Sequence, residues 1–313
     1  MTHRIAVLML VAACHTAAAE PATVKSCVDD GKPFDVDALK ARLTALADPA
    51  LDGRASGSAG ERAARKLIAD RFSCLGLAAA GDSGYEQAFK DSEGNATANL
   101  VAKLPGETDE IVVVGAHHDH LGKGYLGAND NGSGVVGLLA VAQALRQRDA
   151  KPKRTVVFVT FSAEEQGLVG SSYFVAHPPA AVPLDKVVEY INLDMLGSHA
   201  SKGAVYAFGA FPKLTARAVL QKVAKAYPKI NVGIGGNSVR GDQLDFCKQG
   251  IPYVFLWTPD ARCYHEKCDT ADRIDYKGLS AIAGLATGLV EGLADSSVDL
   301  AAERTKRGCG VPK

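Results

Sequence analysis

The sequence lacks three features that would indicate particular classes of protein. Its 35 Lys and Arg residues equal its 35 Asp and Glu residues, and no basic run is interleaved with aromatic side chains, so we expect no nucleic-acid partner. No run of about 18 uncharged apolar residues occurs, which argues against a membrane-spanning helix. Internal repeats and low-complexity linkers are absent too. The 313 residues, 47% of them hydrophobic, therefore predict one large domain with a sizeable core.

The N-terminus is typical of an export signal. Residues 1–4 are short and positive, residues 5–13 are apolar, and three alanines before Glu20 offer a cleavage site. We therefore expect residues 1–19 to be a signal peptide and residues 20–313 to form the functional domain. A lipoprotein signal is the alternative, because VAAC resembles a lipobox and Cys14 would then carry a lipid anchor. Either signal predicts an exported protein that is periplasmic, secreted or anchored by lipid.

Export permits disulfides among the six cysteines that remain when Cys14 is set aside. Cys263 and Cys268 are near enough in sequence to close a small loop, and we expect them to pair. The other four cysteines allow three connectivities; they are Cys27, Cys74, Cys247 and Cys309. The apolar, helix-like segment around Cys247 also fits a buried free thiol.

Strand-like and helix-like segments alternate along the chain. Residues 111–116 and 155–161 are continuous, apolar and β-branched, as in strands that helices cover on both faces. Further strands are expected at 99–104, 187–193 and 253–257, and helices at 36–47, 61–75, 133–148, 169–176, 213–226 and 276–294. This alternation predicts an α/β fold. We expect a single doubly wound domain with a mixed, mostly parallel central sheet flanked by helices and an N-terminal helical extension.

Acidic residues and histidines occur at or just after several of these strands. They are His117, Asp119, Asp130, Glu164, Glu165, Asp194 and His265. The carboxyl ends of parallel strands meet at one edge of a sheet, where ligand sites form. Imidazole nitrogen and carboxylate oxygen are ligands of Zn²⁺. Five such ligands, one of them shared, could hold two ions about 3.5–4 Å apart.

The adjacent glutamates Glu164 and Glu165 give the sharpest local clue. Neighbouring side chains after a strand diverge, so the two residues are suited to different roles. One carboxylate can bind a metal while the other accepts a proton from a metal-bound water, whose pKa a metal can lower to about 7. The pair therefore indicates hydrolytic chemistry.

Five motifs in the same order resemble the secreted dizinc aminopeptidases of the bacterial leucyl-aminopeptidase type. They are HHD at 117–119, GANDNGSG at 127–134, AEEQGLVGS at 163–171, NLDMLGS at 192–198 and CYHEKCDT at 263–270. The likeness runs from about residue 51 to the helix after Asp275. The zinc exopeptidase superfamily to which those enzymes belong also includes glutaminyl cyclases and transferrin-receptor-like proteins. The resemblance implies an aminopeptidase that binds two Zn²⁺ ions and acts on peptides with a free N-terminus.

The resemblance also implies a role for each motif residue. Asp130 would bridge the two zinc ions, His117 and Asp194 would complete one site, and Glu165 and His265 the other. Glu164 would be the general base and acid. Asp119 would orient His117, Tyr264 would stabilise the oxyanion, and Arg240 would contact the substrate. His118 and His120 receive no role, and packing or a surface position is expected for both.

One segment departs from the family pattern, and three other functions are conceivable. Relatives usually carry Ser-Asp-His where this chain has Gly241, Asp242 and Gln243, which affects the expected shape of the pocket near Arg240. A glutaminyl-cyclase-like acyltransferase shares the fold, but its usual sequence differs at GANDNGSG. A carboxypeptidase of the superfamily usually has additional domains. A non-catalytic metal-binding ectodomain would be expected to have lost ligands.

Overall fold

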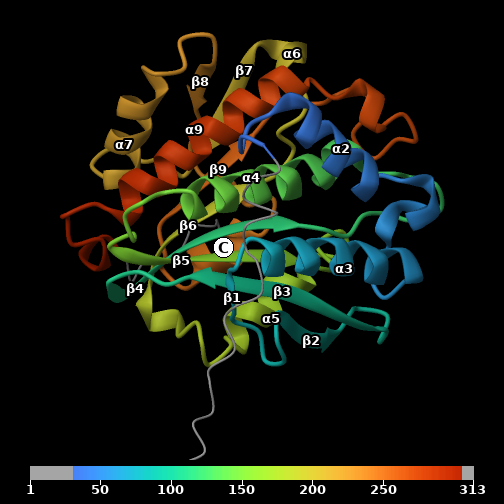
Figure 1. Cartoon of the computed structure of the whole chain (residues 1–313), viewed down its shortest axis with the longest axis horizontal. Helices are drawn as coiled ribbons and strands as arrows, with labels where there is room; N and C mark the ends of the chain where they lie inside the picture. The colour runs from blue at the N-terminus through green and yellow to red at the C-terminus, as the bar shows by residue number, and fades with distance from the viewer. Residues whose placement is uncertain (1–30, 305–313) are drawn as a thin grey trace, which may run out of the picture.

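A mixed sheet of nine strands crosses the middle of the molecule (Figure 1). The computed structural model describes residues 31–304, so the predicted signal peptide, Cys14, Cys27 and Cys309 lie outside the described residues. The strand order is β1-β3-β5-β4-β6-β9-β7-β8, with β2 paired to β3. The strands are β1 (Ala78–Ala79), β2 (Glu86–Lys90), β3 (Ala96–Leu104), β4 (Thr108–His117), β5 (Arg154–Phe161), β6 (Val187–Leu193), β7 (Ala204–Phe208), β8 (Asn231–Ile234) and β9 (Tyr253–Trp257).

The four central strands, β5, β4, β6 and β9, run parallel to one another. Strands β3 and β7 pair antiparallel to the two outer members of this set. The apolar run of β4 is fully buried, as Val112, Val113 and Val114 illustrate. Continuous apolar strands of this kind need cover on both faces, and the predicted mixed, mostly parallel sheet is confirmed.

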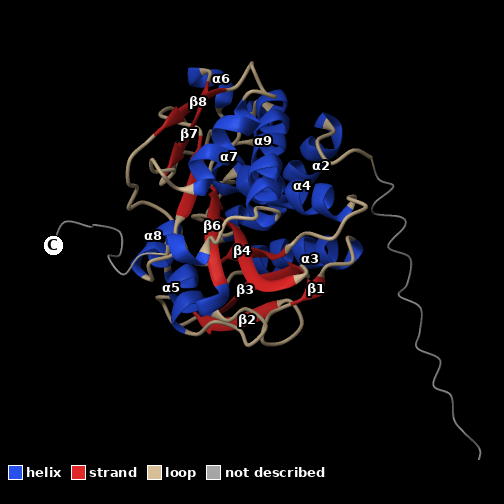
Figure 2. Ribbon diagram, turned by 90° about the vertical axis from the view of Figure 1, so that its left-hand side faces the viewer, coloured by secondary structure: helices blue, strands red, loops and turns tan. Residues whose placement is uncertain are grey.

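Helices cover both faces of the sheet (Figure 2). On one face, the main apolar cluster joins α2 (Val36–Leu46), α3 (Ala59–Cys74), α4 (Gly134–Arg146), α7 (Thr215–Ala224) and α9 (Tyr276–Ala294). On the other face, a second cluster includes α5 (Val169–Ala176) and α8 (Gln243–Lys248). The short helix α6 (His199–Lys202) precedes β7 and contacts α9. The N-terminal helical extension, α2, packs against the C-terminal helix α9 (Figure 1). The first and last α-helices of the described chain therefore pack together within one α/β domain.

The sequence analysis missed β1 and β2 at one end of the sheet and β7 and β8 at the other. Strand β2 alternates exposed and buried residues, and the four residues of β8 are exposed or half-buried. Such short, partly exposed strands lack the continuous apolar run that marks the central ones. The strands that position the site were predicted, whereas the outer strands were not.

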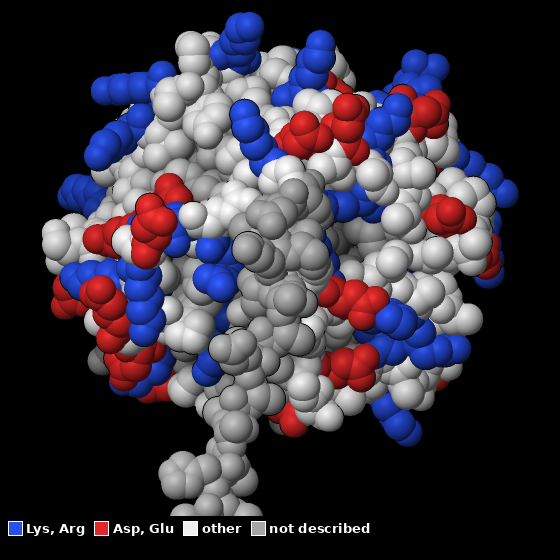
Figure 3. Space-filling model, viewed as in Figure 1, with Lys and Arg blue, Asp and Glu red and all other residues white. Residues whose placement is uncertain are grey.

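The surface carries charges of both signs. On the face in Figure 3, Lys and Arg side chains are interspersed with Asp and Glu side chains. Among residues 31–304, no helix combines the length and the apolar character that crossing a membrane requires.

Candidate metal centre

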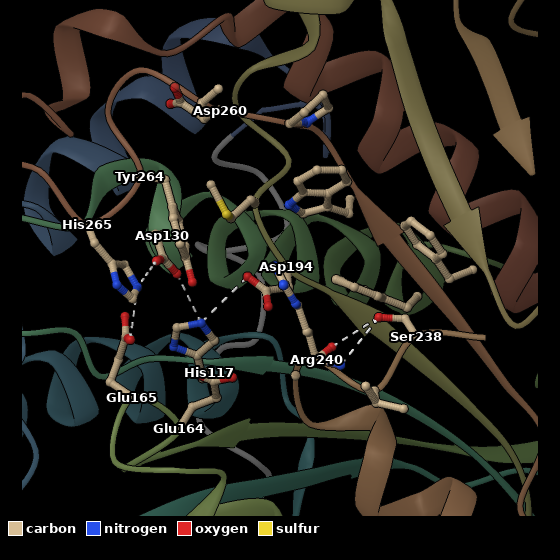
Figure 4. A pocket seen from close by; sticks show the side chains of 18 of the residues that line it. His117, Asp130, Glu164, Glu165, Asp194, Ser238, Arg240, Asp260, Tyr264 and His265 are labelled. Atoms are coloured by element: carbon tan, nitrogen blue, oxygen red, sulfur yellow. Dashed lines mark hydrogen bonds and ion pairs between the residues drawn. The ribbon is translucent and has the colours of Figure 1, made fainter. Parts of the chain in front are cut away.

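The predicted ligands meet at the carboxyl edge of the parallel strands (Figure 4). His117 is the last residue of β4, Asp194 directly follows β6, and Glu164 and Glu165 follow β5. Asp130 comes from the wide turn η2 (Ala128–Ser133) before α4, and His265 from the loop after β9. Five separate segments thus place their side chains in one pocket.

The turn that carries Asp130 is fastened to the end of β6. The side chain of Asn131 accepts the N–H groups of Gly134 (2.9 Å) and Met195 (3.1 Å) and donates to the Leu193 carbonyl (3.0 Å). A side chain at position 134 would begin 2.2 Å from that same carbonyl, so only glycine lets α4 start this close to β6. Asp130 is therefore held next to Asp194.

The carboxylate of Asp130 lies between two histidines. Its Oδ1 is 3.2 Å from His117 Nε2, and its Oδ2 is 3.1 Å from His265 Nε2. Asp194 Oδ1 is 3.5 Å from His117 Nε2, and Glu165 Oε2 is 3.1 Å from His265 Nε2. The five side chains therefore form two neighbouring groups that share one carboxylate.

Metal-ligand chemistry fits this arrangement. Asp130 Oδ2 and Asp194 Oδ1 are buried, yet neither oxygen accepts an aligned hydrogen bond from the part of the chain that the structure describes. Burying a charged oxygen without a partner is costly, and a divalent cation between converging imidazole and carboxylate groups would remove that cost. Ligand atoms of His117, Glu164 and Asp194 lie within 4.8 Å of one another, as do those of His117, Asp130 and Glu165. The residues present can hold metal ions.

Without cations, the surplus of acids shifts the pKa values of the site. Burial, reinforced by Asp242, Asp194 and Glu165, raises the pKa of Glu164 well above its usual range, although His117 opposes the shift. Burial lowers the pKa of His117, but Glu164 and the carboxylates of Asp119, Asp130 and Asp194 outweigh it, and the net pKa is well above the usual value. These shifts are those expected where several carboxylates share a buried space.

Asp119 holds both the imidazole and the tandem glutamates. Its Oδ1 lies 3.7 Å from His117 Nδ1, whose nearer neighbour is the Asp119 carbonyl at 3.2 Å. Its carboxylate accepts the N–H groups of Glu164 (3.1 Å) and Glu165 (3.4 Å). Asp119 thus fixes the turn that presents the two glutamates.

The two flanking histidines have different surroundings. Both rings are buried, as the packing interpretation anticipated for His118, whose Nε2 lies 3.0 Å from Glu61. His120, however, contacts the site: its Nδ1 lies 2.7 Å from Glu165 Oε1, and its ring meets that of His265 edge-on. The sequence analysis missed this contact. The only available signal was its position just beyond β4, next to the ligand motif.

The departing segment 241–243 places two buried side chains behind the site. Gln243 accepts a hydrogen bond from Asn192 (2.8 Å) and donates to the carbonyl of Arg240. Within residues 31–304, neither carboxylate oxygen of Asp242 has an aligned hydrogen-bond donor, and the Ser171 hydroxyl donates to Asp245 (3.1 Å). Burial, together with Asp194 and Asp119 and against His117, raises the pKa of Asp242 to about 7. The sequence analysis named Asp242 as part of a family pattern but gave it no role.

The loop that carries His265 is closed by a disulfide. Cys263 and Cys268 are bonded with their Cα atoms 5.3 Å apart, so their predicted pairing is confirmed. Cys247 is also disulfide-bonded, as is Cys74, and the interpretation of Cys247 as a free thiol was wrong. Cys27 and Cys309 lie outside the described residues, so the three connectivities of these four cysteines stay a prediction.

Tyr264 and Arg240 both line the pocket. The Tyr264 ring stacks on that of His265 with 3.9 Å between centroids, and its side chain is half exposed. Burial, with Asp130 and the other acids, raises its pKa to about 12, so the hydroxyl keeps its proton at neutral pH. Arg240 belongs to the loop beside Asp194 (Figure 4). The pocket encloses about 580 Å³, and its apolar wall consists of Met195, Phe208, Phe255 and Trp257.

Comparison with known families identifies the chain. The sequence model of peptidase family M28 matches residues 99–290. The chain belongs to peptidase family M28. The fold and the superfamily expected from the five motifs are confirmed.

Curated relatives and solved structures agree with this placement in M28. The chain is 31% identical to leupeptin-inactivating enzyme 1 of Streptomyces exfoliatus over 77% of this chain and 58% of that protein. It is 40% identical to a probable leucine aminopeptidase 2 of Aspergillus oryzae over 34% of this chain and 21% of that protein. The chain therefore spans less than two thirds of the length of these relatives.

Two solved structures share the M28 fold. A zinc aminopeptidase from Bacillus subtilis superposes with a TM-score of 0.71 at 16% identity, over 87% of this chain and 98% of that one. A glutaminyl cyclase from Porphyromonas gingivalis gives a TM-score of 0.68 at 24% identity, over 83% and 99%. At these identities the likeness shows the fold, and the chemistry has to be argued from the site.

Proposed function

We propose that this M28 chain is a zinc-dependent aminopeptidase that hydrolyses the N-terminal peptide bond of peptides. The observation that carries the proposal is the position of the Asp130 carboxylate, one oxygen against His117 and the other against His265. A carboxylate so placed is suited to link two cations, and two linked cations are the arrangement of many hydrolytic metal sites.

Each half of the site would hold one Zn²⁺ ion. His117 and Asp194 would serve one ion and Glu165 and His265 the other, with Asp130 common to both. Glu164 also lies within ligand distance of His117 and Asp194. Distance alone therefore does not decide which of the two glutamates is the base and which is the ligand. Glu165 already faces His265 and His120, which leaves Glu164 as the carboxylate free for proton transfer.

The chain's residues would divide the reaction among them. When bound, the two ions supply a Lewis acid for the scissile carbonyl and a water of lowered pKa. Glu164 takes the proton of the attacking water and returns it to the leaving amine. Asp119 keeps Glu164 in place by accepting the N–H group of Glu164. Tyr264, which stays protonated, donates to the oxygen on which negative charge develops.

The pocket suits a peptide that begins at the site. Acids such as Glu164 and Asp194 would attract the terminal ammonium group. The wall of Met195, Phe208, Phe255 and Trp257 offers apolar contact to the first side chain. Arg240, on the loop beside Asp194, would contact the peptide beyond its first residue.

Metal content and substrate choice test the proposal together. We expect about two zinc ions per chain, rapid hydrolysis of unblocked aminoacyl amides and no hydrolysis of their N-acylated forms. A glutaminyl-cyclase-like acyltransferase would instead work with one zinc ion and cyclise N-terminal glutamine. A binding ectodomain would leave all these substrates unchanged. Either of these results would contradict the aminopeptidase assignment.

We also propose that the protein is exported. Disulfides at Cys263–Cys268 and at Cys247 suit an oxidising compartment. Mass spectrometry of the mature protein distinguishes the two signals: a chain beginning at Glu20 indicates a simple signal peptide, and a lipidated Cys14 indicates a lipoprotein. An unprocessed chain that is found in the cytoplasm would contradict export.

A further inference from the structure

The segment 126–130 depends on two side chains outside it for its backbone hydrogen bonds. Its carbonyl groups at Leu126 and Gly127 accept from Arg54 Nη1 (2.6 Å) and Nη2 (2.9 Å). Its N–H groups at Asn129 and Asp130 donate to the carboxylate of Asp269 at 2.7 and 2.9 Å. One guanidinium and one carboxylate therefore hold opposite sides of the backbone that ends at Asp130.

Arg54 also binds the segment that follows His117. Its Nε donates to the His118 carbonyl (2.9 Å), and its own carbonyl accepts the His120 N–H (3.2 Å). The side chain is 1% exposed, so these carbonyl groups replace water as its partners. A single residue thus connects the two segments that carry His117 and Asp130.

The backbone around Arg54 is strained so that this contact can form. Asp52, Gly53 and Arg54 all have left-handed φ angles, of 45°, 73° and 54°. Residues other than glycine adopt such angles only where their surroundings enforce them, and such strain clusters at functional sites. A side chain at Gly53 would begin 2.0 Å from the Tyr125 carbonyl, so the turn packs directly on the segment it supports.

Asp269 connects the same segment to the disulfide loop. It directly follows Cys268 in sequence, and its backbone carbonyl accepts the Ala128 N–H (3.3 Å) in addition to the two bonds of its carboxylate. The loop that carries His265 and the turn that carries Asp130 are therefore fixed relative to each other. The position of Asp130 between the two histidines depends on this link and on Arg54.

We propose that Arg54 and Asp269 are a pair of positioning residues that hold Asp130 between His117 and His265 before any metal ion binds. The inference rests on the proposed function, in which Asp130 is the shared ligand. Neither side chain touches the reacting atoms. Both act by fixing a ligand in advance, and partners of this kind typically change metal affinity or activity about 10–100-fold when replaced.

Two variants and a matched control test the proposal. Arg54→Lys keeps the positive charge but cannot make the forked contacts, and Asp269→Asn keeps the shape but loses one acceptor. Arg154→Lys is the control, because Arg154 is also buried, donating to the carbonyls of Leu293 (3.1 Å), Ser296 (2.7 Å) and Val298 (2.7 Å). It begins β5, at the end of the strand away from Glu164.

The readout is the dissociation constant for zinc, measured by chelator competition on metal-free protein, together with the melting temperature. We expect Arg54→Lys and Asp269→Asn to weaken zinc binding about 10–100-fold. Arg154→Lys should lower the melting temperature while leaving zinc affinity within about threefold of the wild type. If Arg54→Lys does not fold, Asp269→Asn decides alone.

Two results would contradict the proposal that Arg54 and Asp269 position Asp130. One is wild-type zinc affinity in the variants that fold, and the other is an equal loss in Arg154→Lys. Failure of the proposed function is distinguishable from these, because the wild-type protein itself would then bind no zinc or fail to cleave unblocked substrates.

Discussion

The two halves of the proposed metal centre are built differently. His117 ends a central strand, is 1% exposed and lies among Asp119, Asp130 and Asp194. His265 belongs to a loop, has a left-handed φ of 57° and leaves 36% of its side chain exposed. The first half is therefore part of the sheet scaffold, whereas the second depends on a short disulfide-closed loop. Asp130 belongs to both, so the two halves are coupled but should not be equally stable.

Replacing the shared ligand should erase the difference between the halves. Asp130→Asn removes the negative charge that both ligand sets share and replaces one of the two oxygens with an NH2 group, so we expect loss of both zinc ions and the largest fall in activity of any single substitution. Zinc content after dialysis, measured by mass spectrometry, checks this. Asp130→Ala, measured in the same way, is the second variant. Retention of one tightly bound ion in both variants would show that Asp130 serves only one half.

Replacing Glu164 should separate chemistry from metal binding. We expect Glu164→Gln and Glu164→Ala to keep about two zinc ions while kcat falls by about 10²–10⁴-fold, the usual contribution of a general base. Steady-state kinetics at saturating zinc provides the measurement. Near-normal kcat with both ions present would remove Glu164 from this role, and loss of an ion would make it a ligand.

Asp119→Asn should affect the buried half first. The amide can accept only one of the two N–H groups that the carboxylate now accepts from Glu164 and Glu165, and it no longer carries a negative charge near His117. We expect a loss of about 10–100-fold in metal affinity or kcat/KM. A chelator titration with separate steps for the two ions would show the stronger effect on the tighter one. An effect confined to the weaker ion would contradict this assignment.

Opening the disulfide loop should affect the exposed half more than the buried half, and it should have the smallest effect of these four changes. In the double variant Cys263→Ser, Cys268→Ser, His265 and Tyr264 lose a restraint while the ligands on β4 and β6 keep theirs. We expect the dissociation constant of the weaker zinc ion to rise by up to about tenfold. This lies at the low end of the 10–100-fold loss of affinity that follows the removal of supporting contacts. Reversal of the order, with the tighter ion lost first, would contradict the comparison of the two halves.

The positions of the proposed ligands were predictable from the sequence, whereas the contacts of Arg54 and Asp269 were not. His117, Glu164, Glu165 and Asp194 each lie at or near the end of an apolar run, and the shared edge of parallel strands brings such residues together. The motifs then provided their roles. In a doubly wound sheet, residues that follow successive parallel strands in the sequence therefore lie close together at one edge.

The supporting residues come from segments with no local pattern of their own. Arg54 ends the short helical turn η1 (Pro49–Arg54) before α3, and Asp269 directly follows a disulfide-bonded cysteine. The hydrogen bonds of these two residues to the turn of Asp130 each join positions at least 72 residues apart in sequence. His120 was misjudged for the same reason, because its contact with Glu165 depends on how two strand ends align rather than on spacing within one motif.

Anomalous scattering at the zinc edge, from crystals of the zinc-loaded protein, tests the central claim most directly. The account predicts two peaks, one on each side of the Asp130 carboxylate, with the first near His117 and Asp194 and the second near Glu165 and His265. A single peak, or a second peak away from Asp130, would contradict it.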